Sequence, residues 1–310
     1  MPDLHLKQAA WADSLIQKDR RDALSYFVAA TLLLFLSAAH VSAQPLRPKE
    51  ADTSALAQEA IAAYRKGDIP AAIALAGKLI EAAPKQPQSW LLRAQLHNTQ
   101  RQYLKAAADY SEVIKLDAKA AGAWQARGEA HFKAGKMAES IADFDKVLEF
   151  EPAQKPHHWQ RGIALYYAGR FKDGREQFEI HQTVNSNDVE NAVWHFLCAA
   201  RADGLEKAKK GLIPIEGDSR IPMAQVHQLF AGKIKPEDVL ATAKAAPAET
   251  RSGEPMFYAH LYLGIYFEAI GDAKQAREYI FKAAERANQN GYMGDVARVH
   301  ADILRQKDKK

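Results

Sequence analysis

The residues of this chain that could do chemistry are histidines and one cysteine, and their spacing does not favour a reactive site. His157 and His158 are adjacent, and His181 follows on the next expected helix. Neighbouring helix residues point about 100° apart, and no i, i+4 histidine pair with a glutamate base occurs, so a metal site is not favoured. His195 and Cys198 lie at i and i+3, but the apolar run VWHFLCAA around them favours a buried structural thiol.

Other reactive motifs are also missing from the sequence. It has no Gly-rich phosphate loop, no GxSxG elbow and no Cys-x-x-Cys pair, and a single cysteine excludes an intramolecular disulfide. The net charge of +4 is small and its charges are scattered, which gives little support to a nucleic-acid partner. We therefore expect no enzyme activity, no catalytic residue, no cofactor and no metal.

The elements that would position any binding residues follow from an internal repeat. Gly67, Arg101, Gly135 and Gly169 recur at intervals of 34 residues, which indicates stacked units and not a single irregular domain. The four units begin at Thr53, Pro87, Ala121 and Lys155.

Each unit contains small residues at two places where its two helices would cross closely, while large residues nearby fill the layers between hairpins. The eighth position holds Ala60, Ala94, Gly128 and Gly162, and the twentieth holds Ala72, Ala106, Ser140 and Gly174.

The repeat resembles the tetratricopeptide repeat, and residues 121–154 match that pattern best. The matching residues are Trp124, Gly128, His131, Gly135, Ser140, Phe144, Val147 and Pro152. The resemblance implies an all-α fold, a right-handed superhelix of helical hairpins that binds other proteins. Arg101 in place of the turn glycine, and Ala118 in place of the closing proline, predict a slightly different turn in the second unit.

The C-terminal part is expected to continue the same architecture. Residues 255–310 hold a further unit, in which Gly271 keeps the register, and a last helix from about Gly294 to Gln306 that caps the stack with a polar face. Residues 189–246 read as two degenerate hairpins, in which Pro222 and Pro236 are first-turn prolines. This half also resembles the NlpI family of bacterial envelope lipoproteins, through HQLFAGKI, KPEDVLATAKAA and FYAHLYLGIYFEAIGD. That resemblance implies an adaptor for a periplasmic protease or peptidoglycan hydrolases, although the lipid-bearing cysteine is absent.

Residues 1–43 are expected to direct export. The apolar run over residues 23–39 follows Lys18, Arg20 and Arg21 and precedes Val-Ser-Ala, which predicts a signal peptide cleaved after Ala43 and a linker over residues 44–52. About 17 apolar residues also approach the length that spans a bilayer, so an uncleaved N-terminal anchor remains the alternative. The membrane would be a partner only through that uncleaved segment.

A partner is expected on the first helices of the four units over residues 53–188. We use the term groove positions for the second, fifth, ninth, twelfth and thirteenth residues of each unit, which face the concave side by helical spacing. The groove residues expected to bind are Gln88, Leu91, Gln95, Asn98, Gln125, Glu129, Phe132, Lys133, Trp159 and Tyr166.

Amides followed by aromatic rings suit a polypeptide better than a phosphate. Trp159 and Tyr166 could instead pack against the next hairpin. The first unit has Ala57 and Ile61 at groove positions, which does not favour a clamp for C-terminal carboxylates.

These observations favour an exported protein-binding scaffold or adaptor. Two alternatives remain at this point: a membrane-tethered component of envelope assembly, and a cell-wall-acting enzyme with its site in residues 189–246, where the repeat pattern lapses. No nucleophile, acid pair or metal set in that region supports the enzyme.

Overall fold

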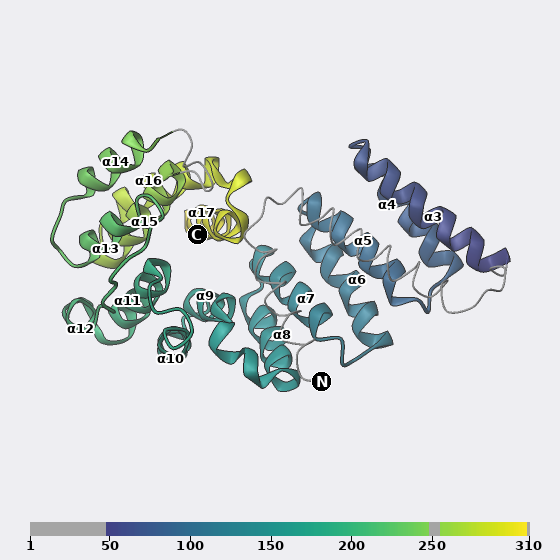
Figure 1. Ribbon diagram of the computed structural model, residues 1–310, viewed down its shortest axis with the longest axis horizontal. Helices are drawn as coiled ribbons and strands as arrows, with labels where there is room; N and C mark the ends of the chain where they lie inside the picture. Colours follow the sequence, from purple (N-terminus) through teal and green to yellow (C-terminus); the bar gives the residue numbers. More distant parts are fainter. Residues whose placement is uncertain (1–47, 248–254, 309–310) are drawn as a thin grey trace. The chain divides into compact units, whose positions relative to one another are not determined.

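The computed structural model describes residues 48–247 and 255–308, and every regular element in these two ranges is a helix. The chain divides into two compact units, one up to Ala123 and one from Trp124 (Figure 1). The expected export segment, residues 1–43, lies outside the described residues. None of the described helices has both the length and the hydropathy that crossing a bilayer requires.

The first unit consists of two helical hairpins. The first helices of both hairpins contribute to one core cluster, through Ala57, Ile61, Leu92 and Leu96, and α4 (Ile69–Ala82) contributes Ala72, Ala76 and Leu79 to it. The first hairpin begins at Pro48, inside the stretch expected to be a linker. The helices are α3 (Pro48–Arg65), α4 (Ile69–Ala82), α5 (Pro87–Thr99) and α6 (Tyr103–Leu116).

The turn between α5 and α6 keeps the backbone conformation of the other repeat turns although it has no glycine. Arg101 has φ 56°, in the same left-handed region as Gly67 at 83° and Gly135 at 76°. The amide of Arg101 donates to the carbonyl of Asn98 at 3.0 Å, as that of Gly135 does to Phe132 at 2.9 Å. The expectation of a different turn at Arg101 is therefore wrong, because the arginine accepts a conformation that costs about 1–2 kcal/mol per non-glycine residue.

The second unit begins with repeat hairpins and continues through shorter helices. Pro236 is the first residue of α14 (Pro236–Ala245) as expected, whereas Pro222 precedes α13 (Met223–Phe230) and is not in its first turn. The hairpins of the repeats are α7 (Ala121–Lys133) with α8 (Met137–Phe150), and α9 (Trp159–Tyr167) with α10 (Phe171–His181), with the short η1 (Pro152–His157) between them. The degenerate region forms α11 (Val189–Asp203), α12 (Leu205–Lys210), α13 (Met223–Phe230) and α14 (Pro236–Ala245). The chain ends with α15 (Pro255–Ile270), α16 (Ala273–Glu285), η3 (Ala287–Gln289) and α17 (Gly291–Lys307).

Close helix crossing at the eighth position is confirmed by the glycines there. A Cβ atom added at Gly162 would lie 2.7 Å from the ring of Phe178, and one added at Gly264 would lie 2.7 Å from the Ile280 side chain. Each glycine thus provides the space in which a large side chain of the partner helix packs.

An ion pair between arginine and aspartate joins the two helices of a repeat hairpin. This pair was not among the features predicted from the repeat. Arg93 donates two hydrogen bonds to Asp109, at 2.9 and 2.7 Å. Arg127 donates two to Asp143, at 2.9 and 2.6 Å. Both pairs recur at the repeat interval, and their bidentate geometry fixes the angle between first and second helix.

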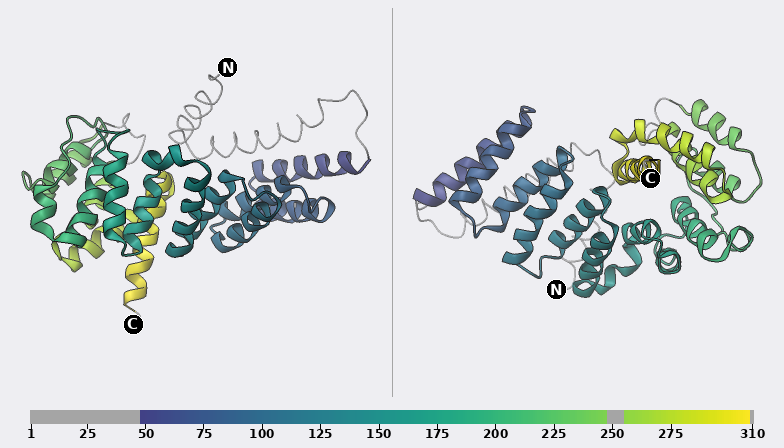
Figure 2. Two further views of the ribbon diagram at one scale, coloured as in Figure 1. Left: turned by 90° about the horizontal axis from the view of Figure 1, so that it is seen from below. Right: turned by 180° about the vertical axis from the view of Figure 1, so that it is seen from behind.

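The last helix does not form a polar cap, which corrects the expectation for residues 294–306. Val296, Ala297 and Ala301 on α17 are fully buried, and His300 is buried as well. In Figure 1, α17 lies on the inner side of the curve formed by the other helices of the second unit, beside α9. Its last turns extend past those helices in the left view of Figure 2. The polar end of the helix is exposed, but its first three turns carry an apolar face that packs inside the unit.

Candidate functional site

The groove positions of the second unit are in contact with α17. The ring of Phe132, on α7, is fully buried and stacks on Tyr292 with 5.3 Å between centroids. Trp159, at the start of α9, meets the same Tyr292 ring edge-on at 5.0 Å. The tyrosine of α17 therefore fills the place between two residues that the sequence assigned to a ligand.

Polar groove positions of α7 also face α17. The Lys133 ammonium lies 3.6 Å from the buried carboxylate of Asp295 and 3.5 Å from that of Glu129. Gln125 donates a hydrogen bond to Glu129 at 3.1 Å. These side chains form one network with the last helix, so they hold α17 in place.

Farther along α9, tyrosines connect the groove positions to the last helix. The hydroxyl of Tyr167 lies 3.1 Å from Nδ1 of His300, whose Nε2 lies 3.3 Å from Glu268. Burial lowers the pKa of His300, although Glu268 opposes that effect. Tyr166 is buried and packs edge-on against Trp194 of α11 at 5.5 Å. In this structure Tyr166 thus packs against the following hairpin.

The groove positions of α5 belong to the first unit, and Gln88, Leu91, Gln95 and Asn98 all keep part of their surface exposed. Asn98 donates a hydrogen bond to the hydroxyl of Tyr110 at 3.1 Å. The side-chain oxygens of Gln95 and Asn98 are buried and have no hydrogen-bond partner in the described part of the chain. A buried amide oxygen without a partner is unfavourable, so a side-chain rotation that brings it to a donor on a ligand would be stabilising.

Two residues of the arrangement were missed by the sequence reasoning, namely Tyr292 and Asp295. The signal was present, because the two lie three residues apart in the apolar-rich stretch GYMGDVARVHA, on one face of a helix. The last helix was expected to begin at about Gly294, after Tyr292, and to have a polar face.

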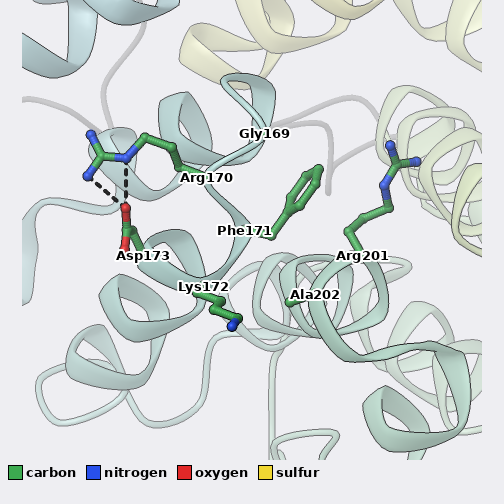
Figure 3. A pocket seen from close by; sticks show the side chains of 7 residues that line it. All are labelled: Gly169, Arg170, Phe171, Lys172, Asp173, Arg201 and Ala202. Atoms are coloured by element: carbon green, nitrogen blue, oxygen red, sulfur yellow. Dashed lines mark hydrogen bonds and ion pairs between the residues drawn. The ribbon is translucent and has the colours of Figure 1, made fainter.

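A recess on the second unit is separate from all of these positions. It has a volume of about 380 Å³ and lies at the turn between α9 and α10, next to the end of α11 (Figure 3). Phe171 lies 5.2 Å from the Arg201 guanidinium, and Arg170 is bonded to Asp173 at 2.7 Å, so the charges at the rim are largely paired. None of the ten expected groove residues lines this recess.

The histidines and the cysteine are dispersed. The His195 ring lies 3.3 Å from Glu179, and burial raises the pKa of the Cys198 thiol far above its usual value. Burial also lowers the pKa of His158 to about 4. Among residues 48–247 and 255–308, no three His, Cys, Asp or Glu side chains converge as metal ligands would.

Comparison with protein families identifies the repeats. A model described as "Tetratricopeptide repeat" matches residues 58–118 and 99–156. The chain contains tetratricopeptide repeats. Their hairpins, which continue beyond the matched residues, make the fold an all-α solenoid of the tetratricopeptide type, and such repeats are protein-interaction modules.

Several solved structures with tetratricopeptide repeats are similar to this chain. MamA from Desulfovibrio magneticus RS-1 is 14% identical, covers 54% of this chain and 92% of its own, and has a TM-score of 0.47. PilW, a type IV pilus biogenesis factor, is 16% identical over 79% of this chain and 97% of its own, with a TM-score of 0.45. The first repeat domain of Spaghetti (RPAP3), solved with an HSP90 peptide, is 26% identical over 32% of this chain and 79% of its own, with a TM-score of 0.30. A comparison with curated proteins gives no match.

Proposed function

We propose that this chain is a non-enzymatic scaffold that binds a polypeptide partner at the groove positions of its first unit. One observation carries the proposal: α17 packs on the groove positions of α7 and α9, and the groove positions of α5 offer partly exposed amides beside Leu91. A partner would find the first unit open and the second already occupied by the chain's own helix.

The chemistry at α5 suits a polypeptide. Gln88, Gln95 and Asn98 can each donate and accept hydrogen bonds, and Leu91 supplies apolar surface between them. The oxygens of Gln95 and Asn98 are buried and unpaired, and rotation of these side chains toward the groove would let them accept bonds from peptide N–H groups. No formal charge stands among these four residues, so what they contribute to recognition is amide hydrogen bonding and apolar contact.

A double substitution tests this surface. Gln95→Ala with Asn98→Ala should weaken capture of the partner about tenfold or more, because each amide contributes about 0.5–1.5 kcal/mol in hydrogen bonds. The melting temperature should change by only a few degrees, since removal of two unpaired oxygens offsets loss of the Asn98–Tyr110 bond.

The matched control is Gln58→Ala with Gln100→Ala. It removes two amides from exposed places of the first unit that are not groove positions. Equal capture by the groove variant and this control would contradict the assignment of the binding surface.

We further propose that the scaffold is exported and acts in the cell envelope, as an adaptor for a protease or peptidoglycan hydrolases. The support is the basic–apolar–small order of residues 1–43 and the resemblance of the C-terminal half to the NlpI family. Expression with a C-terminal tag in a Gram-negative host, followed by crosslinking and mass spectrometry, tests both parts. Cleavage should give a chain that begins at Gln44 in the periplasmic fraction with such an enzyme attached. An intact N-terminus in the membrane fraction would contradict cleavage and favour the tethered alternative.

A further inference from the structure

We propose that Tyr64, Arg65 and Leu91 of the first unit bind an aromatic side chain on a helix that carries a carboxylate one turn later. We call these three residues the Tyr64 patch. The proposal rests on the proposed function, because it names the kind of partner that the first unit takes.

The second unit provides a worked example of such recognition within the chain itself. Tyr292 of α17 lies between Phe132 and Trp159, with centroid distances of 5.3 and 5.0 Å. One turn later on the same helix, Asp295 lies 3.6 Å from the Lys133 ammonium. An aromatic residue and an acid at i and i+3 thus fit three groove positions of two successive repeats.

The first unit has equivalent residues at the same three positions of the 34-residue repeat. Phe132 and Tyr64 both occupy the twelfth position, and Lys133 and Arg65 both occupy the thirteenth. The fifth position of the next repeat is Trp159 after Phe132 and Lys133, and Leu91 after Tyr64 and Arg65. The chemistry is preserved at each place: an aromatic ring, a cation and a large apolar side chain.

The combination is not a general property of these repeats. The second repeat has Asn98 and Thr99 at its twelfth and thirteenth positions, and Gln125 follows at the fifth position of the third. An aromatic residue paired with an acid would find neither a ring nor a cation at these residues. The pattern therefore distinguishes the Tyr64 patch from the neighbouring groove positions.

The backbone and side chains of the first unit place the Tyr64 patch where a partner can reach it. The two helices that carry it, α3 and α5, contribute Ala57, Ile61 and Leu92 to one core cluster. Tyr64 packs against this core but stays partly exposed, as does Leu91.

The cation of the Tyr64 patch is available. The Arg65 side chain is exposed and makes no hydrogen bond or ion pair within the described residues. Arg93 of the same unit is instead tied to Asp109 at 2.7 Å. No acidic residue occupies a groove position of α3 or α5, so the charge on Arg65 is open to a carboxylate from outside.

A synthetic peptide of residues 291–307 is a probe with the required pattern, since it contains Tyr292 and Asp295 in their natural spacing. We expect the labelled peptide to bind the full chain with a dissociation constant in the micromolar range in fluorescence anisotropy. Tyr64→Ala should weaken binding about tenfold, because a truncated aromatic anchor typically costs more than the loss of a rim charge.

Charge exchange gives the decisive comparison. Arg65→Glu should weaken binding several-fold, and a peptide with Asp295→Lys should bind the Arg65→Glu chain better than the unchanged peptide does. Lys66→Glu makes the same charge change at an exposed residue that is not a groove position, and it should leave binding unchanged.

Two results would overturn the proposal. One is binding that is insensitive to Arg65→Glu but lost with Lys133→Glu, because the peptide would then be replacing α17 in the second unit. The other is no binding at millimolar peptide. Neither result would contradict the proposed function, because partner capture through Gln95 and Asn98 does not require the Tyr64 patch and is tested separately.

Discussion

The contact of Tyr292 with the groove positions of the second unit can be tested by two substitutions with opposite expected signs. Tyr292→Ala removes the ring that lies against Phe132 and Trp159 and leaves a cavity between α17, α7 and α9. Truncation of a large buried aromatic residue to alanine costs about 3–5 kcal/mol. The second unit should become less stable by this amount.

Tyr292→Phe keeps the ring and removes only the hydroxyl. That hydroxyl is buried and has no hydrogen-bond partner in the described part of the chain. A buried polar group without a partner costs about 1–3 kcal/mol, so its removal should raise the stability of the second unit by about 1 kcal/mol.

Urea unfolding followed by circular dichroism gives both free energies, and hydrogen exchange assigns the change to the second unit. Exchange in residues 291–301 should become faster in Tyr292→Ala and slower in Tyr292→Phe. Equal stability of the alanine variant and the unchanged chain would refute the docking of α17. A loss of stability in the phenylalanine variant would show that the hydroxyl has a partner.

Three further outcomes follow from single residues. Arg101→Gly should stabilise the first unit by about 0.5–1 kcal/mol in urea unfolding, because glycine adopts φ 56° without strain; no gain would mean that the arginine side chain compensates. Gly264→Ala should destabilise the second unit by about 2–3 kcal/mol, since its Cβ would meet Ile280, including the backbone nitrogen at 2.9 Å; an unchanged midpoint would contradict that packing. Burial lowers the pKa of His158 to about 4, so as the pH falls the unfolded chain binds a proton at His158 before the folded chain does. The free energy of unfolding of the second unit should therefore decrease by about 2–3 kcal/mol between pH 7 and pH 4.5. The decrease should be smaller in His158→Phe.

The repeat hairpins could be predicted from the sequence because their determinants are local. A glycine at the eighth position and a large residue at the twenty-fourth specify one close crossing, and this pair recurs with the repeat, as in Gly162 and Phe178. The left-handed turns also have local determinants in the sequence. Arg101 shows that a non-glycine residue can adopt the same conformation when the flanking hairpin imposes it. The ion pairs between Arg93 and Asp109 and between Arg127 and Asp143 also recur in the sequence and could have been found there.

The position of α17 could not be predicted in the same way, because it depends on contacts between residues far apart in the chain. The sequence around Phe132 and around Tyr292 predicts an apolar helix position for each residue. Neither stretch indicates that the two rings stack on each other. The groove positions of α7 and α9 therefore looked available to a ligand, whereas Trp159 and Lys133 contact the last helix. The α5 positions were expected to bind a ligand for the same reason, and their amides are partly exposed.

The central claim is that the partner uses the first unit while α17 occupies the second. A photo-crosslinking residue placed at Leu91, and separately at Trp159, tests it in cells that express the full chain. The account predicts adducts with another polypeptide from the Leu91 position, and only crosslinks within the chain, to α17, from the Trp159 position. Adducts with another polypeptide from Trp159, together with none from Leu91, would contradict it.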